Sequence, residues 1–285
     1  MNTTLLNEQS DYQPVVRLLV AYDGTNFRGL APNAGVRTVV GDLQLVLGAL
    51  LGQPVSLVMS GRTDAGVHAW GQVLSFVPPD PDAIDLARMQ RTINSRLGPE
   101  IVAREVSWAP PGFSARFDAT ARRYQYQVVN APHPDPFSAR LAWWVPHALD
   151  LSVMNRAAMG FVGEHDFSSF CRRPKVEPPL SLVRRVTAAR WLVVDEPHPF
   201  SSGSPDRQLM RFEIEGSAFC HQMVRSIVGF CVAVGRGKRQ PHEVGEVLAA
   251  RDRGAAEQPA PPHGLTLWSV SYTGERVDTR DRSID

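Results

Sequence analysis

The sequence has few cysteines, and their placement excludes two common kinds of cysteine-based structure. Only three occur among 285 residues, at Cys171, Cys220 and Cys231. Their number is odd, their spacing is wide, and they form no Cys-x-x-Cys pair. The pattern therefore argues against a disulfide framework and against a thiolate zinc site, and it favours reduced thiols packed among apolar residues.

Long apolar runs are missing as well. The most apolar run, Ile227–Val234, is far too short to cross a bilayer, and residues 1–14 lack the basic and apolar regions of a secretory signal. We therefore expect no membrane partner and a cytoplasmic location. The chain is 43% apolar and 21% charged, which is ordinary for a globular protein long enough for two domains.

The chain also lacks a strong net charge, since its formal net charge is only +1. The distribution is less even. Residues 172–190 carry six basic side chains against the single acid Glu177, whereas acidic residues gather near the C-terminus. Such a stretch is able to neutralise phosphates, although charge alone favours a solvated surface. The basic residues proposed to contact an RNA backbone are Arg172, Arg173, Lys175, Arg184 and Arg185.

Hydrophobic periodicity predicts a regular alternation of elements in the first part of the chain. The order is strand, helix, strand, strand, helix, strand, which is the βαββαβ arrangement of a ferredoxin-like unit. Proline and glycine mark several boundaries, as at Pro78-Pro79 and Gly98-Pro99. The predicted elements are 15–22, 38–51, 55–59, 72–77, 83–97 and 101–106.

The second part of the chain repeats this order, with an additional helix. The predicted elements are 122–129, 151–162, 183–194, 209–215, 219–234, 242–250 and 265–272. We therefore expect an α+β protein of two ferredoxin-like halves with joined antiparallel sheets. The predicted divisions are a flexible tail at 1–14, an N-terminal half at 15–110, a C-terminal half at 111–273 and a polar tail at 274–285.

The segment Ser60-Gly61-Arg62-Thr63-Asp64-Ala65-Gly66-Val67-His68-Ala69 is the strongest candidate for a chemical site. It lies between two predicted strands, and its two glycines allow a tight turn close to a ligand. On the residues alone, Asp64 suits a turn-capping role as well as a chemical one.

GRTDAGVHA resembles the signature of the TruA-type tRNA pseudouridine synthases. Further resemblances follow in the same order and cover about residues 15–272. They are YDGTNFRG at 22–29, FSARFDATARRYQYQV at 113–128, HDFSSF at 165–170, AFCHQMVRSIVG at 218–229 and PPHGLTLWSV at 261–270. The resemblance implies the pseudouridine synthase fold and an isomerase that needs neither a metal nor another cofactor.

The same resemblance assigns roles to three catalytic residues. Asp64 is implied to be the nucleophile that attacks the target uridine, since a covalent partner divides glycosidic cleavage and rejoining into easier steps. Tyr124 is implied to stack on the base, and its hydroxyl is suited to reach the C5 proton. Arg225 is implied to keep Asp64 ionised and aimed.

Three further residues are predicted to bind the substrate. The resemblance implies that Arg62 wedges into the RNA stem when the target base leaves the stack. His68 and Arg123 are assigned to substrate binding by their place in the matching segments, and His68 suits a positioning hydrogen bond. One departure is evident: the family follows its YDGT segment with Trp-Gln-x-Gln, whereas residues 30–33 here are Leu-Ala-Pro-Asn.

The family implies tRNA as partner, modification on the 3′ side of the anticodon stem-loop at roughly positions 38 to 40 of the tRNA, and a homodimer. Two other hypotheses stand beside this one. A ferredoxin-like RNA-binding protein without turnover would not require Asp64, Tyr124 and Arg225 together. An enzyme using GRTDAG as a phosphate or metal loop would need a following Lys-Ser or Lys-Thr, or a second nearby carboxylate.

Overall fold

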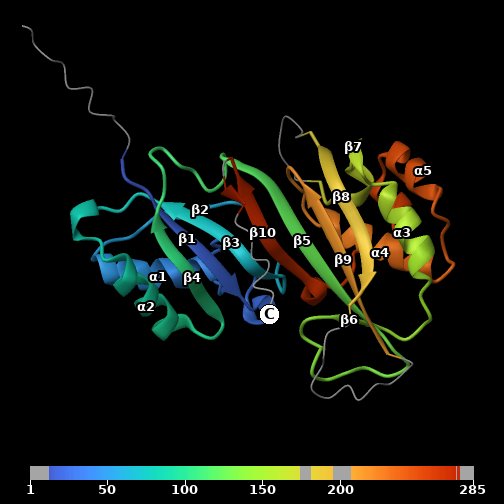
Figure 1. The fold of residues 1–285 in the computed structure, drawn as a ribbon, viewed down its shortest axis with the longest axis horizontal. Coiled ribbons are helices and arrows are strands. Elements are labelled where there is room, and N and C mark those ends of the chain that lie inside the picture. Colours follow the sequence, from blue (N-terminus) through green and yellow to red (C-terminus); the bar gives the residue numbers. More distant parts are fainter. Residues whose placement is uncertain (1–12, 174–180, 195–206, 274, 277–285) are drawn as a thin grey trace, which may run out of the picture.

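The computed structural model describes residues 13–173, 181–194, 207–273 and 275–276 (Figure 1). Within these ranges the strands form one mostly antiparallel sheet, with α-helices packed against it, so the predicted α+β class is confirmed. The α-helices are α1 (Val39–Leu51), α2 (Leu86–Leu97), α3 (Leu151–Met159), α4 (Met223–Gly235) and α5 (Glu243–Ala250). The short 3-10 helices are η1 (Gly24–Asn26), η2 (Pro81–Ala83), η3 (Ser168–Phe170), η4 (Arg253–Ala255) and η5 (Pro262–Gly264).

The sheet of the described residues has 11 strands in the order β4-β1-β3-β10-β5-β9-β8-β7, with β2 on β3, β6 on β5 and β11 on β10. Strand β10 runs parallel to β3 and antiparallel to β5, so it joins the early strands to the later ones. The strands are β1 (Val16–Tyr22), β2 (Val58–Met59), β3 (His68–Phe76), β4 (Ile101–Trp108), β5 (Ala119–Asn130), β6 (Trp143–Val145), β7 (Gly163–Asp166), β8 (Val183–Val193), β9 (Gln208–Gly216), β10 (Leu265–Tyr272) and β11 (Glu275–Arg276).

Helix α1 shows how local signals set the element ends. The Thr38 side chain accepts a hydrogen bond from the Gly41 amide, which satisfies one free donor of the first turn. The helix ends at Gly52, which adopts the left-handed conformation with φ 74°. Between these ends, Leu43 and Leu47 lie one turn apart and are buried against the sheet.

Helix α4 is almost entirely buried and begins later than predicted. The periodic apolar pattern suggested a helix from Phe219, whereas the helix starts at Met223. The reason is Gln222, whose φ of 65° is left-handed and cannot belong to a regular helix. Phe219 instead packs its ring edge-on against Tyr124, with 5.2 Å between the ring centroids.

Strand boundaries also differ from the predicted ones. Strand β3 begins at His68 rather than at residue 72, because a register shift against β1 between Val20 and Tyr22 interrupts the alternation there. Only Val58 and Met59 of the predicted strand 55–59 pair in the sheet. The short strands β6 and β7 were not predicted, since three or four residues carry too little periodicity.

One continuous apolar core lies beneath both parts of the sheet. Its largest side chains include Tyr126, Phe161, Phe212 and Phe230, all fully buried. Among the residues that the structure describes, no helix has the length and apolar character needed to span a membrane. Most of the two predicted tails lies outside the described residues.

Candidate active site

Asp64 lies in the loop between β2 and β3 and contacts two basic side chains. Its Oδ2 atom is 3.2 Å from Nη1 of Arg225, and its Oδ1 atom is 3.2 Å from Nε2 of His221. The Asp64 side chain keeps 25% of its surface exposed, whereas Arg225 keeps only 14%. The Asp64 carboxylate is therefore exposed to solvent on one side and in contact with two basic side chains on the other, so a substrate can approach it.

The Asp64 loop is fixed by buried polar contacts beneath it. The Gln72 side chain accepts a hydrogen bond from Ser60 Oγ at 2.7 Å and donates one to the Gly61 carbonyl at 3.0 Å. The hydroxyls of Tyr22 and Thr63 hydrogen-bond at 2.7 Å. Because these groups are buried, each broken bond would leave an unsatisfied polar atom, and the loop therefore keeps one conformation.

A tight turn aims the carboxylate. The Val67 amide donates to the Asp64 carbonyl at 3.2 Å, and Gly66 adopts a φ of 77° at the third position of this turn. That position favours glycine, and a side chain there would also approach Pro262 to 3.1 Å. The second glycine of the predicted motif is therefore required by backbone geometry.

Helix α4 supplies the second part of the site from its N-terminal turn. Arg225 donates from Nε to the Ala260 carbonyl at 2.7 Å, which orients its guanidinium toward Asp64. The Arg225 carbonyl in turn accepts from the Ala260 amide at 2.9 Å. The N-terminus of a helix carries partial positive charge, so this position attracts negatively charged groups.

Arg122 hydrogen-bonds to both loops of the site, the one between β2 and β3 and the one between β9 and α4. Its Nη2 atom donates to the Ser60 carbonyl at 2.7 Å, and its Nη1 atom donates to the Ser217 carbonyl at 2.6 Å. Two more carbonyls, of Ala119 and Arg116, lie at 3.0 and 3.2 Å. Burial lowers the pKa of this guanidinium below its usual range, yet it stays charged because its ordinary pKa is so high. Sequence reasoning did not assign Arg122 a role.

Tyr124 lies on β5, buried beside Phe219 and close enough to Asp64 for the two groups to interact electrostatically. Burial is the main cause that raises the pKa of its phenol well above the usual range, and Tyr22 and Asp64 add to the effect. The phenol is therefore neutral at physiological pH and able to donate a hydrogen bond.

The buried tyrosines predict a loss of stability in alkali. Burial raises the pKa of Tyr22 to about 12, and it raises the pKa of Tyr124 and Tyr126 further, above an unfolded value of about 10. The contribution of these neutral phenols to the free energy of unfolding is complete below pH 10. It falls as the pH rises toward 12, by about 1.4 kcal/mol per pH unit for each tyrosine. Denaturant midpoints and phenolate absorbance measured together from pH 8 to 12 test this. Phenolate absorbance near pH 10 that accounts for all five tyrosines of the folded protein would contradict it.

The structure places the predicted substrate-binding residues in different surroundings. Arg62 is exposed next to the carboxylate loop, and no hydrogen bond or ion pair of its side chain occurs within the described ranges. His68 is buried with both ring nitrogens engaged: Nδ1 accepts from the Gly24 amide, and Nε2 lies 3.0 Å from the carbonyls of Arg140 and His263. This ring holds loops together beneath the site.

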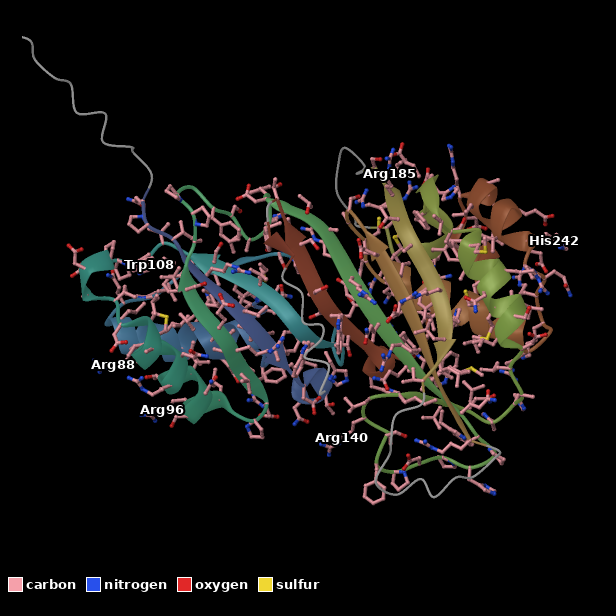
Figure 2. All side chains as sticks on the ribbon, viewed as in Figure 1. Arg88, Arg96, Trp108, Arg140, Arg185 and His242 are labelled. Carbon is pink, nitrogen blue, oxygen red and sulfur yellow. The ribbon has the colours of Figure 1, made fainter. Side chains whose placement is uncertain are left out.

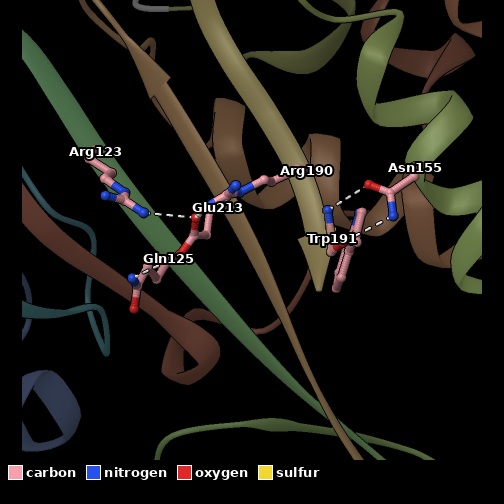
Figure 3. A network of polar contacts seen from close by, with 6 residues as sticks. All are labelled: Arg123, Gln125, Asn155, Arg190, Trp191 and Glu213. Atoms are coloured by element: carbon pink, nitrogen blue, oxygen red, sulfur yellow. Dashed lines mark hydrogen bonds and ion pairs between the residues drawn. The ribbon is translucent and has the colours of Figure 1, made fainter. Parts of the chain in front are cut away.

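Arg123 does not reach Asp64. Its neighbour Tyr124 faces the site, and successive residues of a strand point to opposite faces. Arg123 instead donates to Glu213 at 2.7 Å, and Arg190 and Gln125 contact the same carboxylate (Figure 3). The cluster of Arg123, Gln125, Arg190 and Glu213 thus forms a polar network across β5, β9 and β8, on the face away from Tyr124.

Of the predicted RNA-backbone residues that the structure describes, Arg172 is the one that contacts a residue of the site. Arg172 and Arg173 are exposed, and the Arg172 amide donates to the carbonyl of His221 at 3.0 Å. Arg185 is exposed on β8 and lies 3.5 Å from Glu164, whereas Arg184 is partly buried and donates to the carbonyls of Ser181 and Val183. Lys175 lies outside the described residues.

His221 is the residue that the structure adds beside Asp64. It was not among the predicted site residues, although its place four residues before Arg225 in a matching segment was a usable signal. Its side chain is 46% exposed, so it borders both the carboxylate and solvent. Among the described residues, no group of three or more His, Cys, Asp or Glu side chains is arranged to hold a metal ion.

Comparisons with known proteins identify the family of this chain. The family model described as tRNA pseudouridine synthase matches residues 157–273. The tRNA pseudouridine synthase A of Geobacillus kaustophilus is 37% identical over 262 residues, covering 91% of this chain and 95% of that protein. The protein of the same name from Frankia casuarinae is 39% identical over 261 residues, covering 90% and 89% of the two chains. The chain therefore belongs to the tRNA pseudouridine synthase A family.

Proposed function

We propose that this protein isomerises uridine to pseudouridine in tRNA, with Asp64 as the nucleophile and Arg225 and Tyr124 as its catalytic partners. The observation that carries the proposal is the partly exposed Asp64 carboxylate, which contacts both Arg225 and His221. The matching relatives, which carry the name tRNA pseudouridine synthase A, supply the reaction and the substrate.

The reaction breaks the C–N bond between base and ribose and rejoins the base through C5. A carboxylate nucleophile attacks C6 of the base or C1′ of the ribose, and the contact with the Arg225 guanidinium at 3.2 Å holds the Asp64 carboxylate in place for this attack. Arg225 is itself fixed by the Ala260 carbonyl, so the pair is oriented before substrate arrives. No cofactor is required for this exchange of bonds.

Tyr124 and Arg62 have complementary roles in this proposal. The neutral phenol of Tyr124 is close enough to Asp64 to interact with it electrostatically, and in this proposal the flipped uracil stacks on its ring and loses its C5 proton. Arg62 is exposed at the loop, where its planar guanidinium is suited to fill the gap left by the extruded base. His68 acts from beneath by holding the loop, and Arg123 takes no part in this arrangement.

We also infer that the sheet consists of two ferredoxin-like halves, residues 15–110 and 111–273. The strand order β4-β1-β3-β2 in the first and β10-β5-β9-β8 in the second supports this, because both follow the same 4-1-3-2 pattern with antiparallel neighbours. We further propose a cytoplasmic homodimer that modifies the 3′ side of the anticodon stem-loop, as the family resemblance implies.

Pseudouridine mapping of tRNA tests the proposed function directly. Cells with and without this chain should differ by pseudouridine in the anticodon stem-loop, and the purified protein should restore it on unmodified tRNA. Binding of tRNA without any new pseudouridine would favour the alternative of an RNA-binding protein that lacks turnover. Modification confined to another part of the tRNA would contradict the anticodon assignment alone.

The exposed arginines next to His221 predict a salt-dependent contribution to tRNA affinity. Replacing Arg172 and Arg173 together by alanine should remove up to two phosphate contacts. The slope of log affinity against log salt should then become shallower by about 1.5, at about 0.7 to 0.9 per contact. Filter binding or fluorescence anisotropy across several salt concentrations measures this slope.

A double variant on α2 provides the control for this measurement. Arg88 and Arg96 are also exposed, but they lie at the opposite end of the molecule from Arg185 (Figure 2). Replacing both by alanine removes the same charge and should leave the salt slope unchanged. Equal slopes for both double variants and the unmodified protein would show that Arg172 and Arg173 form only a solvated surface.

A further inference from the structure

Two of the three cysteines form a pair immediately behind the candidate active site. Cys171 follows η3, and Cys220 lies in the segment between β9 and α4. The Cys220 thiol donates to the Leu182 carbonyl at 3.9 Å, and the two thiols are close enough to affect one another's acidity. One residue further along each segment, the Arg172 amide donates to the His221 carbonyl at 3.0 Å, so the two segments run side by side.

The two thiols differ in exposure and in acidity. Cys171 is buried with 1% of its surface exposed, whereas Cys220 is only partly buried. The interaction between the two thiols lowers the pKa of Cys220 and raises that of Cys171, and burial raises the pKa of Cys171 further. The guanidinium of Arg184 acts on both sulfurs and favours the thiolate, while Asp166 opposes it. The sulfur that is better exposed is thus also the better nucleophile.

We propose that Cys220 is an oxidation site for peroxides and that Cys171 is its resolving thiol. The Cys220 thiolate attacks one oxygen of hydrogen peroxide, the O–O bond breaks, and a sulfenic acid and hydroxide result. The Cys171 sulfur then attacks the sulfenic sulfur, an S–S bond forms, and the hydroxyl leaves as water. Two thiols are oxidised to one disulfide, and one peroxide is reduced to two waters.

The position of the pair connects this oxidation to the candidate active site. Cys220 directly precedes His221, whose ring lies 3.2 Å from Asp64, and the Cys220 carbonyl accepts from the amide of Met223 at the start of α4. A disulfide requires a narrow range of distances and dihedral angles, so its formation repositions this segment. We expect oxidation to lower the rate of pseudouridine formation at least about tenfold, because small misplacements of active-site groups reduce the rate by this much. This expectation rests on the proposed function.

The test has a chemical and a functional readout. The reduced full-length protein is treated with hydrogen peroxide, free thiols are alkylated, and the peptides are analysed by mass spectrometry. We expect a cross-linked pair of peptides containing Cys171 and Cys220, with Cys231 still alkylated. Pseudouridine formation should fall in the same samples and return after treatment with dithiothreitol.

Three serine variants separate the roles. Cys171→Ser should accumulate a sulfenic acid at Cys220 that dimedone traps, Cys220→Ser should keep its activity in peroxide, and Cys231→Ser should behave as the unmodified protein. Peptides in which both Cys171 and Cys220 stay alkylated after peroxide would overturn the proposal, as would peroxide inhibition that persists in Cys220→Ser. A reduced protein that makes no pseudouridine would instead refute the proposed function, while the cross-link remained measurable.

Discussion

Asp64→Asn is expected to abolish pseudouridine formation while leaving the fold and tRNA binding nearly unchanged. The amide has the size of the carboxylate and still accepts a hydrogen bond from Arg225, but it carries no charge and is a poor nucleophile. Turnover should fall by at least about 1,000-fold, as it does when a covalent nucleophile is removed. Single-turnover assays on anticodon stem-loop RNA, combined with binding and thermal unfolding, measure the three properties separately.

Two controls strengthen this experiment. Asp80→Asn changes a turn-capping aspartate of η2 and should keep full activity. An RNA with 5-fluorouridine at the target position should stall the unmodified protein or be converted to an altered adduct, because fluorine replaces the hydrogen that leaves C5. Asp64→Asn should leave that RNA untouched. An Asp64→Asn protein that folds and still isomerises uridine would refute the nucleophile assignment, whereas one that unfolds would indicate a turn-capping role.

Arg122→Met is expected to have the largest effect on stability. The substitution keeps much of the aliphatic stem but removes the donor from the part-buried carbonyls of Ser60 and Ala119 and from the exposed carbonyl of Ser217. We expect a loss of about 2 to 3 kcal/mol in the free energy of unfolding, since an unsatisfied acceptor that water does not reach costs roughly 1 to 3 kcal/mol, whereas water replaces the donor at the exposed carbonyl. Activity should fall too, because the carbonyls of Ser60 and Ser217 precede loops of the site.

Arg123→Met is the matched control, because it removes the same group from the next residue of the same strand. Glu213 keeps Arg190 at 2.7 Å after this change, so its charge stays paired and the cost should be smaller, about 1 kcal/mol. Chemical denaturation of both variants, with pseudouridine assays, makes the comparison. Equal destabilisation by the two substitutions would show that Arg122 does not specifically fix the loops.

Much of the fold was predictable where one face of an element is buried and the other is not. Helix α1 and strand β10 follow this rule, and their residues show the expected periodicity. The start of α4 was not predictable, because Gln222 takes a left-handed conformation that only its tertiary surroundings impose. The extension of β3 back to His68 depends on a register shift with β1, which is a property of the pair of strands.

The candidate site, like the fold, was predictable only in part. Resemblance identified Asp64 and Arg225, and the structure brings their side chains into contact across 161 positions of sequence. The contact of His221 with Asp64 and the four carbonyls around Arg122 arise from folding, so no local pattern contains them. Arg123 shows the converse, since its neighbour matched the family and yet strand alternation turns its side chain to the other face.

The place of β10 has a consequence for how the protein is made. This strand follows both β3 and β5 in the sequence and therefore leaves the ribosome after them, yet it lies between the two in the sheet. Until residues 265–272 emerge, the edges of β3 and β5 that β10 will cover lack this partner, and such edges can associate with other chains. The sheet that supports Asp64 and Tyr124 is thus completed only after β10 has been made, and a chain stopped short of β10 leaves these two edges for chaperones to cover.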